Sequence, residues 1–279
     1  MTTTNGLPRR AFIRVGLAVA TTGGLSACSG RDSTTSQASP SAQRGDGEAA
    51  GSTTDAADEA TPTPSQTSAD AEATIVAAAV VSRLQVFGEP ADIDDLGAAG
   101  EAGQVLDRSE RITGQLILLA LEVGKAWTQV QLPVRPNGST GWVRSSEVSL
   151  SSHNYSIDIS LGGHQIVVTN AGNEVLRSPI GVGRADRPTP GGDYFITELL
   201  QPPDPDGLYG PYAYGLSGYS DVLMDFRGGE GVIGIHGTNE PDLVGTDVSS
   251  GCIRLPNAEI TRLVDAVGVP LGTPVTIRS

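Results

Sequence analysis

The chain has 279 residues and a formal net charge of −14 at neutral pH. Its 32 acidic residues outnumber 18 basic ones, which argues against binding to a nucleic acid duplex through neutralisation of phosphate charge. The only two cysteines are Cys28, near the N-terminus, and Cys252, near the C-terminus.

Residues 1–27 predict an export signal. Arg9 and Arg10 precede a weakly apolar run that is too short to cross a bilayer. RRAFIR resembles a twin-arginine translocation signal, and LSAC, which ends at Cys28, resembles a bacterial lipobox, whose cysteine receives diacylglycerol through a thioether. The alternative is an ordinary secretory signal with an incidental cysteine. We expect an exported protein, lipid-anchored to the outer face of the cytoplasmic membrane and facing the cell wall.

Residues 28–73 predict a lipidated cysteine followed by a disordered linker. From Ser29 to Ala73 there are 45 residues without a single Val, Ile, Leu, Met or aromatic side chain. Such a segment cannot bury enough apolar surface to offset the entropy lost on ordering. We therefore expect the folded part, residues 74–279, to stand away from the membrane surface and to form two compact domains.

Residues 74–150 alternate short apolar runs with turn residues, which predicts a small β-barrel module. Asn137–Gly138 and Thr140–Gly141 predict a tight connection between two strands. The stretch AWTQVQLPVRPNGSTGWVRSSEV resembles the closing hairpin of bacterial Src-homology-3-like wall modules. Trp127 and Trp142 are expected in the core of this module rather than on a ligand platform, and no binding residue is assigned to it.

Residues 154–279 predict a second β domain, so the fold class is all-β with one or two short helices. Alternating apolar residues predict its first strand, namely Tyr155, Ile157, Ile159 and Leu161. A short helix is predicted to begin at Asn257, because asparagine is a favoured capping residue. Apolar residues with helical spacing follow it: Ile260, Leu263, Val264 and Val267. Cys252 then lies at the end of a strand or turn that leads into this helix.

Four of the six tyrosines alternate with glycines in one stretch, from Tyr209 to Tyr219. This stretch is either a mobile loop over a cleft or a long β-hairpin packed on the core. Asp204 and Asp206 precede it, but two carboxylates are too few to make a calcium site. We expect no bound metal.

Cys252 is a candidate nucleophile. If Cys28 carries lipid, Cys252 has no partner for an intramolecular disulfide, and its thiol is either buried and inert or reactive. The commonest device for making a thiolate at neutral pH is a histidine within hydrogen-bond reach. His153 and His164 are expected to face solvent, whereas His236 directly follows an apolar run at a strand end.

IHGTNEP, a spacer and SSGCIRL form a more specific pattern. Fifteen residues separate His236 from Cys252, and Arg254 stands two places after the cysteine. This pattern resembles the L,D-transpeptidase family with its YkuD-type catalytic domain, over roughly residues 154–279. Ser250 stands where many family members carry a histidine, but the family's catalytic base matches His236.

The resemblance implies a β-sandwich-like catalytic domain and a peptidoglycan L,D-transpeptidase that forms 3→3 cross-links without a cofactor. It implies that Cys252 attacks the carbonyl joining a dibasic residue to D-alanine in a tetrapeptide stem, and that an amine of a neighbouring stem resolves the thioester. The expected partners are peptidoglycan stem peptides, membrane lipid at Cys28 and carbapenem-type inhibitors. The alternatives are a catalytically silent wall-binding lipoprotein, supported only by Ser250, an L,D-carboxypeptidase, and a sortase-like protein transpeptidase.

Each site residue has a predicted role. His236 acts as general base and then general acid, and the resemblance implies that the Gly237 carbonyl holds its far ring nitrogen. Gly251 lets the chain turn, and the amides of Gly251 and Cys252 are expected to face the oxyanion. The candidate substrate-binding residues are Arg254, Ser249, Ser250, Thr238 and Tyr212.

Two of these candidates have an alternative role. Arg254 either clamps a substrate carboxylate through a bidentate contact or pairs with a surface acid. Ser249 either braces the loop before the cysteine by a hydrogen bond or is an ordinary turn serine.

Overall fold

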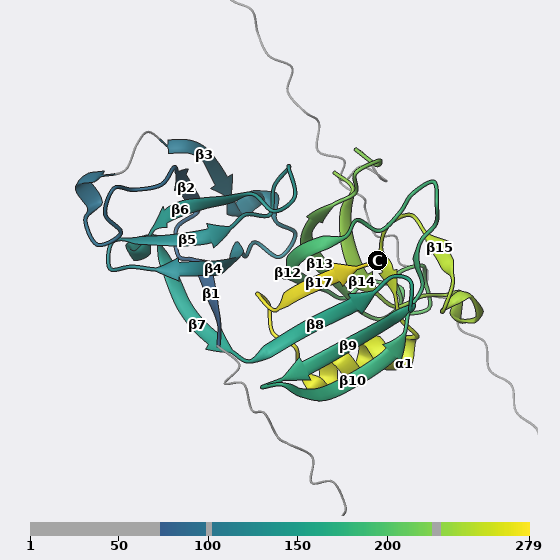
Figure 1. Cartoon of the computed structure of the whole chain (residues 1–279). Coiled ribbons are helices and arrows are strands. Elements are labelled where there is room, and N and C mark those ends of the chain that lie inside the picture. Colours follow the sequence, from purple (N-terminus) through teal and green to yellow (C-terminus); the bar gives the residue numbers. More distant parts are fainter. Residues whose placement is uncertain (1–72, 99–101, 225–229) are drawn as a thin grey trace, which may run out of the picture. The chain divides into compact units, whose positions relative to one another are not determined.

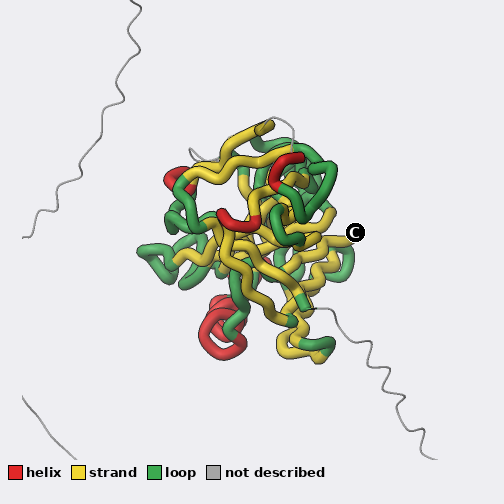
Figure 2. Tube along the Cα trace, turned by 90° about the vertical axis from the view of Figure 1, so that its left-hand side faces the viewer, coloured by secondary structure: helices red, strands yellow, loops and turns green. Residues whose placement is uncertain are grey.

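A computed structural model of the chain describes residues 73–98, 102–224 and 230–279. They belong to one compact unit, Thr63–Ser279, whereas the predicted export signal and the linker up to residue 72 lie outside the described residues. Strands dominate the regular structure (Figure 1), and helix occupies only a small part of the chain (Figure 2). The predicted all-β class is confirmed. No helix in the three described ranges has the length and apolar character needed to span a membrane.

The N-terminal sheet has seven antiparallel strands in the order β3-β2-β6-β5-β4-β1-β7. Its strands are β1 (Thr74–Ala79), β2 (Arg83–Phe87), β3 (Ala102–Asp107), β4 (Ile117–Val123), β5 (Trp127–Gln131), β6 (Thr140–Arg144) and β7 (Val148–His153). Buried residues from β1, β2, β4, β5 and β6 meet in one hydrophobic cluster, among them Ala77, Leu84, Leu118, Val130 and Val143. Because distant strands of the ladder share this cluster, the sheet curls around its core.

The connection between β5 and β6 differs from the predicted tight turn. It runs over residues 132–139, and Thr140 and Gly141 already belong to β6. A Cβ on Gly141 would lie only 2.3 Å from a methyl group of Val86, so this glycine permits close packing inside the sheet rather than a turn. Trp127 and Trp142 are 1% and 5% exposed, which confirms their core position.

The C-terminal sheet has eight strands in the order β10-β9-β8-β17-β12-β13-β14-β16. Its strands are β8 (Tyr155–Ser160), β9 (Gln165–Asn170), β10 (Asn173–Pro179), β12 (Gly192–Leu200), β13 (Ala213–Tyr219), β14 (Val232–His236), β16 (Ile253–Arg254) and β17 (Pro274–Arg278). Two pairs, β8 with β17 and β14 with β16, are parallel. A separate parallel pair joins β11 (Val182–Gly183) to β15 (Asp247–Ser249).

The predicted helix is present as α1 (Asn257–Thr261), which continues as a π-helical turn, Arg262–Val267. Single 3-10 turns occur at Leu96–Ala98, Arg108–Glu110, Ser145–Glu147 and Pro241–Leu243. Ile260 and Leu263 are fully buried in the core of the C-terminal sheet. Asn257 does not cap the helix as predicted, because its side-chain oxygen accepts a 2.7 Å hydrogen bond from the Thr238 amide instead.

The second half of the tyrosine-rich stretch is packed on the core, whereas the mobility predicted for it stays a prediction. This half forms β13, in which Tyr214 and Tyr219 are buried. The Tyr214 hydroxyl donates a 3.0 Å hydrogen bond to the Val269 carbonyl, which fixes this half on the core. Tyr209 lies in the loop before β13.

The change from one sheet to the other falls between β7 and β8, where the sequence predicted a domain junction. Hydrogen bonds join the two sheets. The Gln131 amide donates to the Asp193 carbonyl over 2.7 Å, and the amide and hydroxyl of Thr113 each donate to the Glu198 carboxylate over 3.0 Å. That the two sheets are separate domains stays a prediction.

Candidate active site

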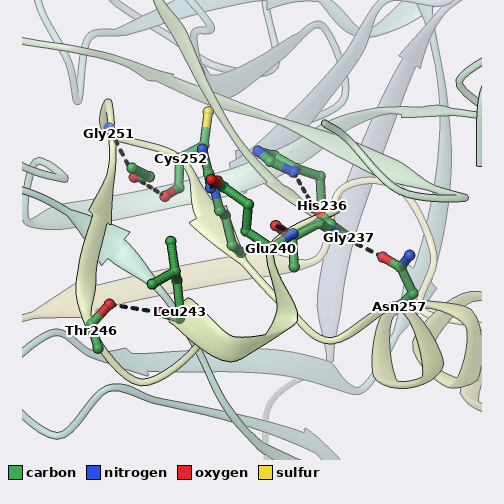
Figure 3. A network of polar contacts seen from close by, with 11 residues as sticks. His236, Gly237, Glu240, Leu243, Thr246, Gly251, Cys252 and Asn257 are labelled. Carbon is green, nitrogen blue, oxygen red and sulfur yellow. Dashed lines mark hydrogen bonds and ion pairs between the residues drawn. The ribbon is translucent and has the colours of Figure 1, made fainter. Parts of the chain in front are cut away.

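Two parallel strands bring His236 and Cys252 together. β14 ends at His236, β16 begins directly after Cys252, and the register pairs Ile235 with Ile253 and His236 with Arg254. Ile235 and Ile253 are fully buried in the core. Since alternate side chains of a strand point to opposite faces, His236, Cys252 and Arg254 share the other face. Figure 3 shows the His236 imidazole and the Cys252 sulfur in the same upper part of the residues drawn.

The segment between the two strands folds back on itself, which lets them pair. Its 3-10 turn, Pro241–Leu243, is followed by a 2.7 Å hydrogen bond from the Thr246 hydroxyl to the Leu243 carbonyl (Figure 3). The Gly245 amide donates to the Ile180 carbonyl over 3.0 Å, which attaches the segment to the C-terminal sheet. The fifteen residues between His236 and Cys252 thus fold back far enough for β14 and β16 to pair in parallel.

The imidazole of His236 is held as a neutral base. Its Nδ1 lies 2.6 Å from the Gly237 carbonyl oxygen, as the family resemblance implied. A carbonyl only accepts, so Nδ1 carries the proton and Nε2 is left as the acceptor. Burial, opposed by the Gly237 contact and helped by the Arg254 charge, lowers the pKa of His236 to about 4. His236 is therefore uncharged at neutral pH.

This neutral histidine makes folding stability depend on pH. The unfolded chain binds a proton at His236 near pH 6.5, whereas the folded chain binds it only near pH 4. Between these values the unfolded state holds more protons, so acidification favours it. We expect His236 to account for a loss of about 3 kcal/mol in the free energy of unfolding from pH 7 to pH 4.

Urea unfolding at several pH values measures this loss. A His236→Gln variant lacks the titrating group and should lose less stability over the same range. An equal loss in both proteins would contradict the assignment.

Cys252 has a partly exposed residue surface and a protonated thiol in the resting site. Burial raises the pKa of its thiol, while a backbone hydrogen bond from Gly234 and the charge of Arg254 lower it without reversing the direction. The thiol thus needs a base to become a nucleophile. His236, neutral and on the same strand face, is the candidate for that base.

Ser249 braces the loop before Cys252, the first of its two predicted roles. Its hydroxyl donates to the Cys252 carbonyl over 2.5 Å and accepts a 3.1 Å hydrogen bond from the Gly251 amide. Ser249 is 1% exposed, so water does not replace either contact. The backbone at Gly251 has a φ of +116°, a conformation that L side chains rarely adopt.

Replacing Ser249 with alanine should therefore disturb both folding and catalysis. It would leave a buried carbonyl and a buried amide without partners, which costs about 1–3 kcal/mol in the free energy of unfolding. We expect kcat of any acyl transfer to fall roughly tenfold or more, since oxyanion donors act only when positioned. Ser151→Ala is the control, because Ser151 is an exposed serine of β7 that does not line the pocket. Similar unfolding curves and rates for the two variants would refute the bracing role.

The predicted oxyanion role of Gly251 is wrong for this geometry. Its amide already donates to the Ser249 hydroxyl, so it does not point at a substrate oxygen. The Cys252 amide remains the candidate donor. Sequence reasoning could not separate the two, because either amide can face a ligand when Gly251 turns.

Arg254 combines features of both of its predicted roles. Its Nη1 lies 2.6 Å from a carboxylate oxygen of Glu240, and the side chain is 12% exposed. Its Nε is buried and has no partner among the described residues. Arg254 also lines the pocket that holds Cys252. It thus pairs with an acid and presents a cation to the pocket at the same time.

Two further predicted residues lie beside the cysteine loop or the histidine turn. Ser250 lines the pocket. Thr238 is buried, its hydroxyl accepting from the Glu240 amide over 3.0 Å, and it supports the turn after His236 rather than facing the pocket. Thr238 is not among the described residues that line the pocket, and its predicted substrate contact stays a prediction.

Tyr212 is also away from the thiol. Its hydroxyl donates a 3.0 Å hydrogen bond to Asp265, and its ring lines a different cavity, among the prolines Pro202, Pro205 and Pro211. The tyrosine that does approach the site is Tyr209, whose ring packs edge-on against His236 with 4.9 Å between ring centroids. Sequence reasoning named the stretch but not the member that contacts the imidazole.

Gly234 is the other site residue that the sequence analysis missed. It lies on β14 two residues before His236, hence on the same face, and its backbone hydrogen-bonds Cys252. A Cβ there would come within 2.8 Å of the Tyr214 carbonyl oxygen. Strand alternation in VIGIHG was the available signal, because it puts a side-chain-free position beside the histidine.

The other two histidines do not simply face solvent as predicted. His153 is half-buried at the sheet junction, where burial lowers its pKa. His164 is half-buried too, and its Nε2 lies 2.8 Å from an Asp247 oxygen. Neither lines the pocket of Cys252. Within the described ranges, no group of three or more His, Cys, Asp or Glu side chains is arranged to hold a metal ion.

Residues 154–277 match the sequence profile of the L,D-transpeptidase catalytic domain, YkuD. Two relatives, from Bacillus licheniformis and Bacillus subtilis, are provisionally named L,D-transpeptidase YkuD. Each is 35% identical to this chain, over 44% of it and 65% of the relative's own length. The solved L,D-transpeptidase 3 from Mycobacterium tuberculosis, in complex with a faropenem-derived adduct, is 22% identical with a TM-score of 0.37, over 52% of this chain and 76% of that one.

Proposed function

We propose, from the premise that residues 154–277 carry a YkuD-type L,D-transpeptidase catalytic domain, that this protein is a cysteine-dependent peptidoglycan L,D-transpeptidase that forms 3→3 cross-links. One observation carries the proposal: a neutral His236, its Nδ1 held by the Gly237 carbonyl, shares a pocket with Cys252. A base and a thiol so arranged suit acyl transfer.

The first half of the reaction forms an acyl-enzyme. Nε2 of His236 takes the thiol proton as the Cys252 sulfur attacks the carbonyl that joins a dibasic residue to D-alanine. The Cys252 amide donates to the oxyanion that develops on this carbonyl. The intermediate collapses to a thioester, and His236 returns the proton to the leaving amine of D-alanine.

The second half transfers the acyl group. An amine of a neighbouring stem attacks the thioester, His236 accepts the proton that this amine loses, and the thiolate leaves. The thiolate then regains the proton from His236. The new amide bond is the cross-link, and the two halves together consume no cofactor.

Arg254 suits a substrate with a carboxylate near the scissile bond. Its guanidinium lines the pocket and has one face engaged with Glu240. A substrate carboxylate would bind the same guanidinium and compete with Glu240 for it.

Ser250 gives little support to the silent-lipoprotein alternative. The base in this site is His236, and the histidine that Ser250 replaces in many relatives is not needed for the proton transfers above. A carbapenem-type inhibitor should acylate Cys252 by the same attack, since its strained carbonyl meets the same thiol and base.

Export and anchoring extend the proposal to the part of the chain outside the described residues. The RRAFIR and LSAC stretches support lipidation of Cys28 and a position outside the cytoplasmic membrane. The resemblance of residues 74–150 to wall modules supports a role of the N-terminal sheet near the wall polymer. Mass spectrometry of the purified N-terminal peptide, with or without a diacylglycerol adduct on Cys28, tests the anchoring.

The activity is tested with a Cys28→Ala chain, which stays out of the membrane and keeps Cys252 as its only thiol. Incubated with a disaccharide tetrapeptide, it should release D-alanine and accumulate a thioester adduct on Cys252. A 3→3 dimer among the products supports the transpeptidase, whereas tripeptide monomers alone would support an L,D-carboxypeptidase. A folded chain that gives neither D-alanine nor adduct would support the silent alternative.

A further inference from the structure

The loop that joins β5 to β6 in the N-terminal sheet contacts the segment that follows β13 in the C-terminal sheet. Arg135 in this loop donates to three backbone carbonyls: Nη1 to Ser220 over 2.9 Å, and Nη2 to Leu223 over 3.2 Å and to Glu230 over 3.0 Å. These carbonyls come from two stretches of chain, on either side of residues 225–229. One guanidinium therefore ties both stretches to the N-terminal sheet.

Three further contacts fix the loop to the end of β13. Asn137 makes a two-point contact with the Tyr219 backbone, its amide donating to the carbonyl over 2.8 Å and its oxygen accepting from the amide over 2.9 Å. The Tyr219 hydroxyl donates to the Pro133 carbonyl over 2.7 Å. The guanidinium of Arg135 also stacks on the Tyr219 ring, 4.9 Å from its centroid. Backbone and side chain of Tyr219 are thus both held by residues 133–137.

The segment that Arg135 holds is a wall of the pocket around Cys252. Ser220, Leu223, Gly231 and Val232 all line that pocket. The wall is closely packed, since the Ser220 amide donates to the Gly231 carbonyl over 2.8 Å and a Cβ on Gly231 would lie 2.0 Å from the Leu223 carbonyl oxygen. A shift of the carbonyls that Arg135 gathers would therefore move the lining itself.

We propose that Arg135 is a positioning residue for the candidate active site: by gathering the carbonyls of Ser220, Leu223 and Glu230 it sets the shape of the pocket wall that receives the stem peptide. Arg135 does not line the pocket, so it acts through the wall and not on the reacting atoms. The inference rests on the proposed function for its substrate, but not for the contact itself. It gives the N-terminal sheet a role in acyl transfer besides any role in wall binding.

Arginine suits this task better than lysine. Its planar fork presents five donors in fixed directions, so it can serve three carbonyls at once. The ammonium group of lysine places all its donors on one nitrogen, so it cannot serve three separated carbonyls in the same way. If the loop served only to hold the two sheets together, the position of Leu223 and Val232 would not depend on the shape of the cation.

The experiment compares three variants in the Cys28→Ala chain: Arg135→Ala, Arg135→Lys and the control Arg83→Ala. Arg83 is an exposed arginine of the same sheet that approaches Asp107 at 3.8 Å, and it does not line the pocket. Hydrogen–deuterium exchange, measured without substrate, reports how well the backbone amides of the pocket wall are protected. We expect faster exchange within residues 219–224 and 230–233 in Arg135→Ala, with wild-type exchange in β8, β9 and β17.

Steady-state release of D-alanine then measures the effect of each variant on activity. We expect Arg135→Ala to lose roughly tenfold to a hundredfold in kcat/KM, mainly through a higher KM, because a misplaced wall weakens the binding of substrate in its reactive position. Arg135→Lys should restore little, added ethylguanidinium should restore part of the loss, and Arg83→Ala should match the parent. Alkylation of Cys252 by iodoacetamide should keep its pH profile, since His236 is untouched.

The outcomes separate this inference from the proposed function. Unchanged exchange in the wall, or unchanged kcat/KM in a folded Arg135→Ala, overturns the positioning role even if the parent chain is fully active. Faster exchange throughout the C-terminal sheet, with a lower melting temperature, would also overturn it in favour of a general structural role. A parent chain that releases no D-alanine refutes the proposed function, and the exchange data then still decide whether Arg135 orders the wall. If Arg135→Ala does not fold, the same readouts are applied to Arg135→Lys.

Discussion

Replacing Cys252 with alanine is expected to abolish both D-alanine release and the thioester adduct. Cys252 carries the only thiol among the described residues that line the pocket, and it is the group that His236 is proposed to activate. Removal of a nucleophile that works together with its base costs roughly 10⁴-fold or more in kcat. Release of D-alanine from the tetrapeptide, measured in single turnover, gives this ratio.

The control tests whether Cys252→Ala still binds the substrate although it lacks the nucleophile. Cys252→Ala should still be stabilised against thermal unfolding by the tetrapeptide, because Arg254 and the pocket wall remain in place. Cys252→Ser replaces the thiol by a hydroxyl that His236 ionises poorly and should be nearly as inactive. Release of D-alanine by Cys252→Ala at the rate of the parent chain would end the proposal.

Replacing His236 with glutamine should lower kcat by about 10²- to 10⁴-fold, the range expected for loss of a positioned general base. The thiol of Cys252 has a raised pKa, so without the imidazole it remains protonated at neutral pH. The parent enzyme should show a pH profile that reflects the same geometry. Because burial lowers the pKa of His236 to about 4, its activity should not fall near pH 6.5 on acidification but only as the pH approaches 4.

His164→Gln is the matched control for this prediction. His164 is the same residue type, paired with Asp247 rather than placed in the pocket, so its loss should leave kcat unchanged. A His236→Gln chain with the kcat of the parent, or a parent profile with an inflection at the ordinary histidine pKa, would show that another group takes the thiol proton.

The sequence by itself determined the class of fold and named the candidate reacting pair. Alternating apolar residues are a local signal, and the strand of Ile157 and Ile159 and the helix with Ile260 and Leu263 are where the pattern put them. Cys252 and His236 were identified as candidates because a thiol, an imidazole and their neighbouring glycines occur in two short sequence motifs. The contact between His236 and the Gly237 carbonyl was implied by the family resemblance, and it joins adjacent residues.

The surroundings of the pair were decided only by the tertiary structure. Nothing local indicates that Ser249 occupies the Gly251 amide, that Tyr209 rather than Tyr212 packs on the imidazole, or that Glu240 meets Arg254. The tight turn expected between β5 and β6 is instead a longer loop. Its Arg135 holds chain some ninety residues away.

Such contacts join groups from separate strands, and each forms only when the sheets have curled and packed. A polar side chain can form hydrogen bonds with many groups. Which one it bonds depends on the backbone groups that the folded structure brings near it and leaves without another partner. The candidate reactive residues could thus be identified from the sequence, whereas the pocket that surrounds them is a property of the packed sheets.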